Sequence, residues 1–147
     1  MKRFIFGLTT AAMLLTACGE ESKYESEDAK LKEYTVNTAK AVRTYAFKAL
    51  YGDEVDADKF IKADEYIEAF KNDINRDKLS NDKAVLYDDL LRGLRKYDKL
   101  ADEAKKGDKA FERAANEEDD SADFLEIAEY YDETDDDNDF KELSEIK

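Results

Sequence analysis

The sequence predicts an all-α fold: a small antiparallel helical bundle of three long helices plus a shorter C-terminal helical segment. None of the 147 residues is proline. Because proline interrupts the hydrogen bonds of a helix interior, its absence favours long unbroken helices. Apolar residues recur with the period of an α-helix along most of the chain. No stretch alternates polar and apolar residues and no Asn-Gly turn occurs, so nothing in the sequence indicates a sheet.

The first long helix is expected over Glu27–Tyr51, where small and apolar side chains gather on one face when plotted at about 100° per residue. Ser26 is the expected N-cap, because its hydroxyl can accept a hydrogen bond from a backbone N–H of the first turn. Gly52 suits the position after the last turn. The face consists of Leu31, Tyr34, Thr35, Thr38, Val42, Tyr45, Ala46 and Ala49.

Three apolar residues of this helix, Val36, Phe47 and Tyr51, lie off that face. An exposed apolar patch can mark a partner site. The alternative is that the helix is sandwiched, so that these residues contact the C-terminal segment. We prefer this second interpretation.

A second helix is expected from Asp58, as its N-cap, to Ile74. Its apolar residues are spaced three and four apart, a pattern that makes one narrow buried seam. The seam consists of Phe60, Ala63, Ile67, Phe70 and Ile74. Residues 75–80 then form a connection.

A third helix is expected to begin at Ser80 or Asn81. It reaches Lys106, just before Gly107. Its apolar residues form two overlapping stripes, and a face this broad needs partners on two sides, so we expect this helix to be central. Gly93 in its interior costs about 1 kcal/mol relative to alanine and suggests the close approach of a neighbouring helix. The stripes are Ala84, Tyr87, Leu91, Leu94 and Ala101, and Leu86, Leu90, Tyr97, Leu100 and Ala104.

After the third helix the sequence predicts a short helix over Asp108–Asn116 and a last helix capped by Ser121. The last helix places four residues on one face: Phe124, Ile127, Ala128 and Tyr131. From Asp132 onward the chain is acidic. Its apolar anchors are Phe140, Leu143 and Ile146.

The tyrosines at helical spacing have two interpretations. They could form a sugar-stacking platform, or they could be core residues whose hydroxyls reach the rim of the core. We expect the second arrangement for Tyr34, Tyr45, Tyr87, Tyr97 and Tyr131.

The first 19 residues have the pattern of a secretory signal. Lys2 and Arg3 precede an apolar run over Phe4–Ala17, which is shorter than the roughly 20 residues that a spanning helix needs. The run ends in Leu15-Thr16-Ala17-Cys18. This sequence resembles the lipobox of bacterial lipoproteins.

The resemblance covers residues 1–19 and implies cleavage before Cys18, a diacylglyceryl group on the Cys18 thiol, and retention on the extracytoplasmic face of the cell membrane. An ordinary signal peptide with an incidental cysteine is the alternative. We expect a signal peptide in residues 1–17, the lipidated cysteine and a polar tether in 18–28, the helical bundle in 29–131 and an acidic tail in 132–147.

The charge of the chain is strongly negative. It has 38 acidic and 24 basic residues, a formal net charge of −14. This sign argues against binding to nucleic acid. Residues 108–147 hold 17 of the acidic residues and four of the basic ones. Such a region attracts cations or basic proteins, although a solubilising tail without a dedicated partner is also consistent with it.

Composition limits the chemistry that the chain can perform. It has no histidine and one cysteine, which excludes Ser-His and Cys-His catalytic pairs, imidazole zinc ligands and a disulfide framework. Asp135, Asp137 and Asp139 match the start of a calcium-binding EF-hand loop. However, Phe140 and Ile146 stand where that loop needs glycine and glutamate. We therefore expect no catalytic residues, no cofactor and no built metal site.

The expected function is a non-catalytic interaction module of the bacterial cell envelope, of the kind to which inhibitors and exclusion or immunity lipoproteins belong. Its partners would be the membrane, through Cys18, and a cationic or envelope protein. The alternative is a lipoprotein that binds a small molecule or a metal ion.

Overall fold

The computed structural model of the chain describes residues 23–52, 54–117 and 123–134. These residues form an all-α bundle without strands, as the sequence predicts. The long helices are α1 (Glu27–Ala41), which continues through a π-helical turn (Val42–Ala46) into α2 (Phe47–Tyr51), then α3 (Ala57–Asp73) and α4 (Asn81–Ala104). A 3₁₀ turn (Arg76–Lys78) joins α3 to α4, and the shorter helices are α5 (Asp108–Ala115) and α6 (Phe124–Thr134).

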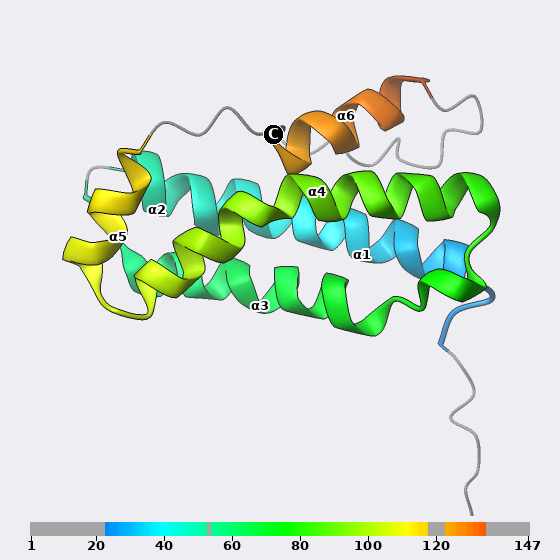
Figure 1. Cartoon of the computed structure of the whole chain (residues 1–147), viewed down its shortest axis with the longest axis horizontal. Helices are drawn as coiled ribbons and strands as arrows, with labels where there is room; N and C mark the ends of the chain where they lie inside the picture. The colour runs from blue at the N-terminus through cyan, green and yellow to red at the C-terminus, as the bar shows by residue number, and fades with distance from the viewer. Residues whose placement is uncertain (1–22, 53, 118–122, 135–147) are drawn as a thin grey trace, which may run out of the picture.

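Neighbouring long helices run in opposite directions (Figure 1). In that view α1 and α4 both run toward the end of the bundle where α5 lies, whereas α3 runs in the opposite direction. The helix α6 lies on α4 and also contacts α1, and α5 lies at the end of the bundle to which α2 belongs. Within the described residues, no helix has the length and apolar character that a bilayer-spanning segment needs.

The first helix begins as predicted. The Ser26 hydroxyl oxygen accepts a hydrogen bond from the Ala29 N–H at 3.1 Å. The π-helical turn was not predicted; in it the Phe47 N–H donates to the carbonyl oxygen of Val42. Gly52 ends α2 with φ of −74°, so the position does not use the left-handed region. A Cβ there would lie 2.4 Å from the Lys48 carbonyl oxygen, and this close approach explains the glycine.

The predicted N-cap of the second helix is wrong by two residues. Asp56, with extended backbone, accepts a hydrogen bond from the Lys59 N–H at 2.8 Å, and α3 begins at Ala57. Asp58 instead lies in the first turn, where its charge faces the positive end of the helix dipole. The predicted seam is confirmed, because all of its members are buried: Phe60, Ala63, Ile67, Phe70 and Ile74.

Carboxylates at the start of α1 hold the connection between α3 and α4. Glu27 accepts a hydrogen bond from the Asn75 N–H at 2.7 Å, and Asp28 accepts one from the Ser80 N–H at 2.9 Å. Ser80 precedes α4 with extended backbone, but its side chain makes no capping hydrogen bond. Beyond the other end of α4, Gly107 adopts φ of 105°, a conformation that glycine adopts readily.

The predicted central position of the third helix is confirmed. In the structure α4 packs against α3, α5 and α6 and touches α1. Residues of both predicted stripes are buried, among them Tyr87 and Leu94 from one and Leu90 and Tyr97 from the other. Because α4 is covered from several directions, it is the centre of the fold (labelled α4 in Figure 1).

Gly93 permits the contact between α4 and α6. A Cβ added to this residue would lie 2.7 Å from both the Cα and the backbone nitrogen of Phe124. Phe124 is fully buried, and its ring packs edge-on against that of Phe70 at 5.7 Å between centroids. The predicted close approach at Gly93 is thus confirmed, and the approaching element is the first turn of α6.

Gly93→Ala is expected to lower the free energy of unfolding by roughly 1–2 kcal/mol. Alanine gains about 1 kcal/mol of helix propensity, but overpacking against backbone that cannot rotate away costs about 2–3 kcal/mol, at the upper end of the usual range. Urea denaturation followed by circular dichroism measures the change. Val85→Ala, at an exposed position of the same helix, is the control and should change stability by less than about 0.5 kcal/mol. An alanine variant as stable as the parent would contradict the close contact.

Candidate interaction site

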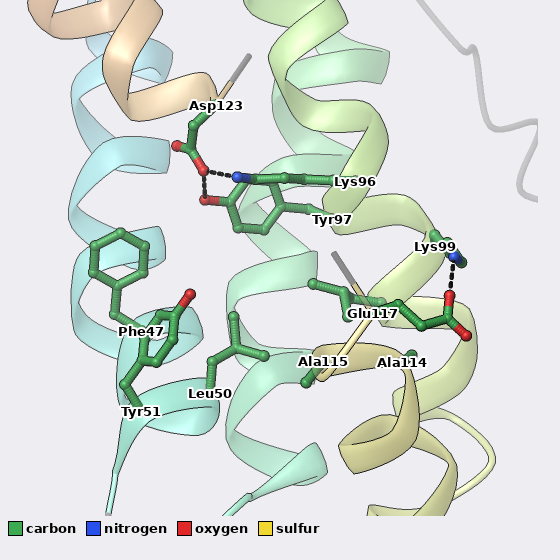
Figure 2. A pocket seen from close by; sticks show the side chains of 11 residues that line it. Phe47, Leu50, Tyr51, Lys96, Tyr97, Lys99, Ala114, Ala115, Glu117 and Asp123 are labelled. Atoms are coloured by element: carbon green, nitrogen blue, oxygen red, sulfur yellow. Dashed lines mark hydrogen bonds and ion pairs between the residues drawn. The ribbon is translucent and has the colours of Figure 1, made fainter. Parts of the chain in front are cut away.

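A hollow of about 310 Å³ lies where α2, the C-terminal half of α4 and the end of α5 meet the residue that precedes α6 (Figure 2). It lies toward the end of the bundle formed by α2 and α5. Its lining residues are Phe47, Leu50, Tyr51, Lys96, Tyr97, Lys99, Leu100, Ala114, Ala115, Glu117 and Asp123.

One wall of the hollow is aromatic. Phe47 and Tyr51 lie one helical turn apart on α2, with ring centroids 5.9 Å apart and planes at 80°. Phe47 is 37% exposed and Tyr51 is 79% exposed. Leu50, Ala114 and Ala115 line the hollow beside them. Two exposed aromatic rings lie next to apolar side chains here. A partner that covered them would be stabilised, because apolar surface would be removed from water.

A polar cluster closes the hollow on the α6 side. The Tyr97 hydroxyl donates to Asp123 Oδ2 at 2.9 Å, and Lys96 forms an ion pair with the same carboxylate oxygen. The other oxygen, Oδ1, accepts a hydrogen bond from the Leu125 N–H at 2.8 Å. Asp123 therefore joins the first turn of α6 to α4. Figure 2 shows the three side chains pointing toward one another.

Tyr97 acts here as a hydrogen-bond donor. Its side chain is buried in the core, and this burial raises the pKa of the phenol far above its usual value. The negative charge of Asp123 raises that pKa further. The phenol consequently stays protonated at neutral pH.

The opposite rim carries an exposed ion pair. Lys99 Nζ lies 2.5 Å from Glu117 Oε2, and both side chains are more than half exposed. An exposed pair of this kind contributes about 0–1 kcal/mol and can rearrange at little cost. The hollow thus combines aromatic and apolar side chains with a larger accessible polar lining that includes two ion pairs, an arrangement that can hold a group with both apolar and polar parts.

A second hollow, of about 490 Å³, lies on the other side of α2. Two of its acidic residues have structural roles: Asp56 caps α3, and Asp108 accepts a hydrogen bond from the Ala57 N–H at 3.0 Å. The other two, Glu54 and Asp58, are exposed and make no side-chain hydrogen bond or ion pair within the described part of the chain. Lys48 and Lys59 are its basic residues.

The three apolar residues that lie off the main face of the first helix do not all have the same environment. Val36 is buried and Phe47 and Tyr51 are exposed, so the three do not form one patch. Phe47 and Tyr51 line the hollow together with Ala114, Ala115 and Asp123, and the preferred interpretation, in which all three residues contact the C-terminal segment, stays a prediction. The hollow itself was not predicted. The sequence signal that could have found it is the position of these two aromatic residues away from the apolar face of their helix.

The interpretation of the tyrosines as core and rim residues is confirmed for four of the five; the fifth, Tyr45, is partly buried against the core. Tyr87 and Tyr97 are buried, and Tyr34 and Tyr131 are partly buried against the core. Their hydroxyls bond to groups at the rim: Tyr34 to Asp73, Tyr87 to the Lys71 carbonyl, Tyr97 to Asp123 and Tyr131 to Asp89.

Other predicted sites lie outside the described residues. These are Cys18, the predicted cap Ser121, the partial calcium motif at Asp135, Asp137 and Asp139, and the anchors Phe140, Leu143 and Ile146. Within the described part of the chain, no three acidic or cysteine side chains come together as a metal site would require. α6 continues to Thr134, three residues beyond Tyr131, where the bundle was expected to end.

The chain matches no protein-family model, and it resembles no curated protein and no solved structure closely enough to count as a match. No relative therefore assigns a role to any residue of the hollow.

The stability of the fold is expected to fall as the pH rises above about 10, and Tyr97→Phe should reduce this fall. An unfolded tyrosine ionises near pH 10, whereas folding raises the pKa of Tyr97. Stability linked to this residue is therefore complete below pH 10 and is lost as the pH rises beyond it. Tyr34, whose pKa burial raises to about 12, contributes to the same loss.

Urea denaturation at pH 8, 10 and 11 measures this dependence. At pH 8 the phenylalanine variant should be less stable by about 0.5–1.5 kcal/mol, because it lacks the hydrogen bond to Asp123. Tyr66→Phe, at an exposed position, is the control and should keep the parental pH dependence. If Tyr97→Phe also keeps that dependence, the buried phenol is not its source.

Proposed function

We propose that the protein is a lipid-anchored, non-catalytic interaction module on the extracytoplasmic face of a bacterial cell membrane, and that the hollow beside α2 is its contact site. The observation that carries the proposal is the pair of exposed aromatic side chains, Phe47 and Tyr51, at the edge of the hollow. Aromatic residues that can be covered by a partner supply much of the binding energy at protein interfaces.

The anchor part of the proposal rests on the lipobox-like sequence Leu15-Thr16-Ala17-Cys18. Two acyl chains at Cys18 suffice for stable attachment, since each buried CH₂ contributes about 0.8 kcal/mol, whereas one chain binds only marginally. Inhibitors and exclusion or immunity lipoproteins are proteins of this general kind, and we place the chain with them by analogy alone.

The position of the hollow supports a role in contacting other molecules. The described chain enters the bundle at Ser26, beside the connection between α3 and α4. α2 lies at the other end of the first long helix, about 37 Å away at 1.5 Å per residue over Glu27–Tyr51. A bundle tethered at its first end can hold the hollow away from the bilayer.

A small-molecule ligand is the second candidate. A volume of about 310 Å³ lies at the lower end of the usual range for ligand pockets, and the Tyr97–Asp123 pair offers polar groups for orientation. For the metal-ion form of this alternative, the described residues offer no cluster of ligands.

The test uses the full-length protein, expressed in its own source organism with a photo-crosslinking amino acid in place of Tyr51. We expect the protein to be retained in the membrane fraction and to form a discrete protein adduct on illumination. Cys18→Ala should abolish incorporation of labelled palmitate, because the thiol that carries the diacylglyceryl group is gone. It should leave unprocessed precursor, or release the protein to the medium if another peptidase cleaves it.

The same crosslinker in place of Tyr66, an exposed tyrosine of α3 that does not line the hollow, is the control and should retain the membrane attachment without the adduct. Unchanged palmitate incorporation by Cys18→Ala would contradict the anchor. Equal adducts from both crosslinker positions, or none from Tyr51, would contradict the contact site.

A further inference from the structure

The short helix α2 separates two hollows of different character. Phe47, Leu50 and Tyr51 line the first hollow, described above, and give it an aromatic wall. Lys48, and Gly52 at the end of α2, line the second one. The two hollows also share α5: its end contributes to the first and its first residue, Asp108, to the second. A single partner segment that crosses α2 would therefore meet both surfaces.

The second hollow is acidic, and part of its charge is not used by the fold. Glu54 and Asp58 are exposed and have no side-chain partner within the described residues, whereas Asp56 and Asp108 are occupied as hydrogen-bond acceptors. Lys59 is paired with Asp56 at 3.2 Å. The carboxylates of Glu54 and Asp58 can therefore receive a cationic group from outside without breaking an interaction between residues that the structure describes.

The two hollows together restrict the occupant by charge and by shape. An anionic bilayer or a nucleic acid would be repelled by the acidic hollow and by the net charge of −14. A second copy of the chain brings the same acidic surface and the same charge. A basic segment is attracted, and its apolar side chain has the hollow beside Phe47 and Tyr51 to fill.

We propose, in an inference that rests on the proposed function, that the partner is a protein segment. In this segment a large apolar side chain, best an aromatic one, lies next to lysine or arginine. The apolar side chain fills the hollow between α2, α4 and α5, and the cationic group binds Glu54 and Asp58 on the other side of α2. Burial supplies most of the affinity, and the charges set the choice of partner and the rate of association.

The experiment uses the lipidated, membrane-extracted protein in neutral detergent micelles and the synthetic peptide Gly-Lys-Trp-Lys-Gly. The chain contains no tryptophan, so tryptophan fluorescence reports on the peptide alone, and empty micelles give the background. We expect a saturable blue shift of the emission. A peptide with glutamate in place of lysine should give no shift, and one with glycine in place of tryptophan should not compete.

Variants of the protein locate the binding. Tyr51→Ala should weaken binding by about fivefold or more, the loss typical of an interface residue that contributes energy. The double variant Glu54→Gln with Asp58→Asn should weaken binding severalfold and flatten its dependence on salt. Tyr66→Ala and Glu65→Gln, exposed positions of α3 outside both hollows, are the matched controls and should bind as the parent does.

Several results would overturn the inference: no saturable shift, equal binding of the glutamate peptide, or equal affinity of the parent and the Tyr51→Ala and charge variants. Concentration-dependent self-association that Tyr51→Ala abolishes would make a second copy the occupant instead. A Tyr51 crosslink in cells together with failure of the basic peptide would leave the proposed contact site standing and reject only this class of partner.

Discussion

The fold depends on one constraint: α4 has apolar side chains on two sides, and a single neighbour cannot cover both. The first two long helices cover one side, and α6 covers the other, with α5 at the end. The cover on the α6 side is close enough that position 93 can have no side chain, since a Cβ there would overlap the backbone of Phe124. The polar links between α6 and the long helices, Asp123 with Tyr97, Tyr131 with Asp89 and Arg43 with Glu129, lie around this contact.

The candidate site lies where one helix that covers α4 is replaced by the next. Along α4, the neighbour changes from α6 to α5, and the hollow lies where Asp123 precedes one helix and Glu117 follows the other. Tyr97 fills the space beneath with a ring stacked on Phe60 at 6.3 Å between centroids. On the remaining side α2 presents Phe47 and Tyr51 to this space and its polar residues to the acidic hollow. The position of α2 therefore gives the site both of its chemical characters.

Periodicity was enough to predict the helices, the buried seam of α3 and the central place of α4, and the unfavourable helix propensity of Gly93 indicated the close contact there. Periodicity could not decide the N-cap of α3 or the exposure of the aromatic residues of α2, because both depend on contacts between segments far apart in the sequence. Asp56 and Asp58 are equally good caps by residue type, and the Ala57 N–H that separates them bonds to Asp108, 51 residues away. Likewise, the exposure of Phe47 and Tyr51 depends on where α5 and α6 end and begin, which helical spacing within α2 does not reveal.

Residue-resolved hydrogen exchange of the native protein tests most directly whether α4 is the element on which the other helices depend. The slowest amides should be those of α4 between Leu90 and Tyr97, exchanging only through global unfolding, because all the other long elements must separate before they open. Amides of α6 should exchange faster, through local opening of its contact at Gly93. Exchange in the middle of α4 that is faster than in α1 or α3 would contradict this view of the fold.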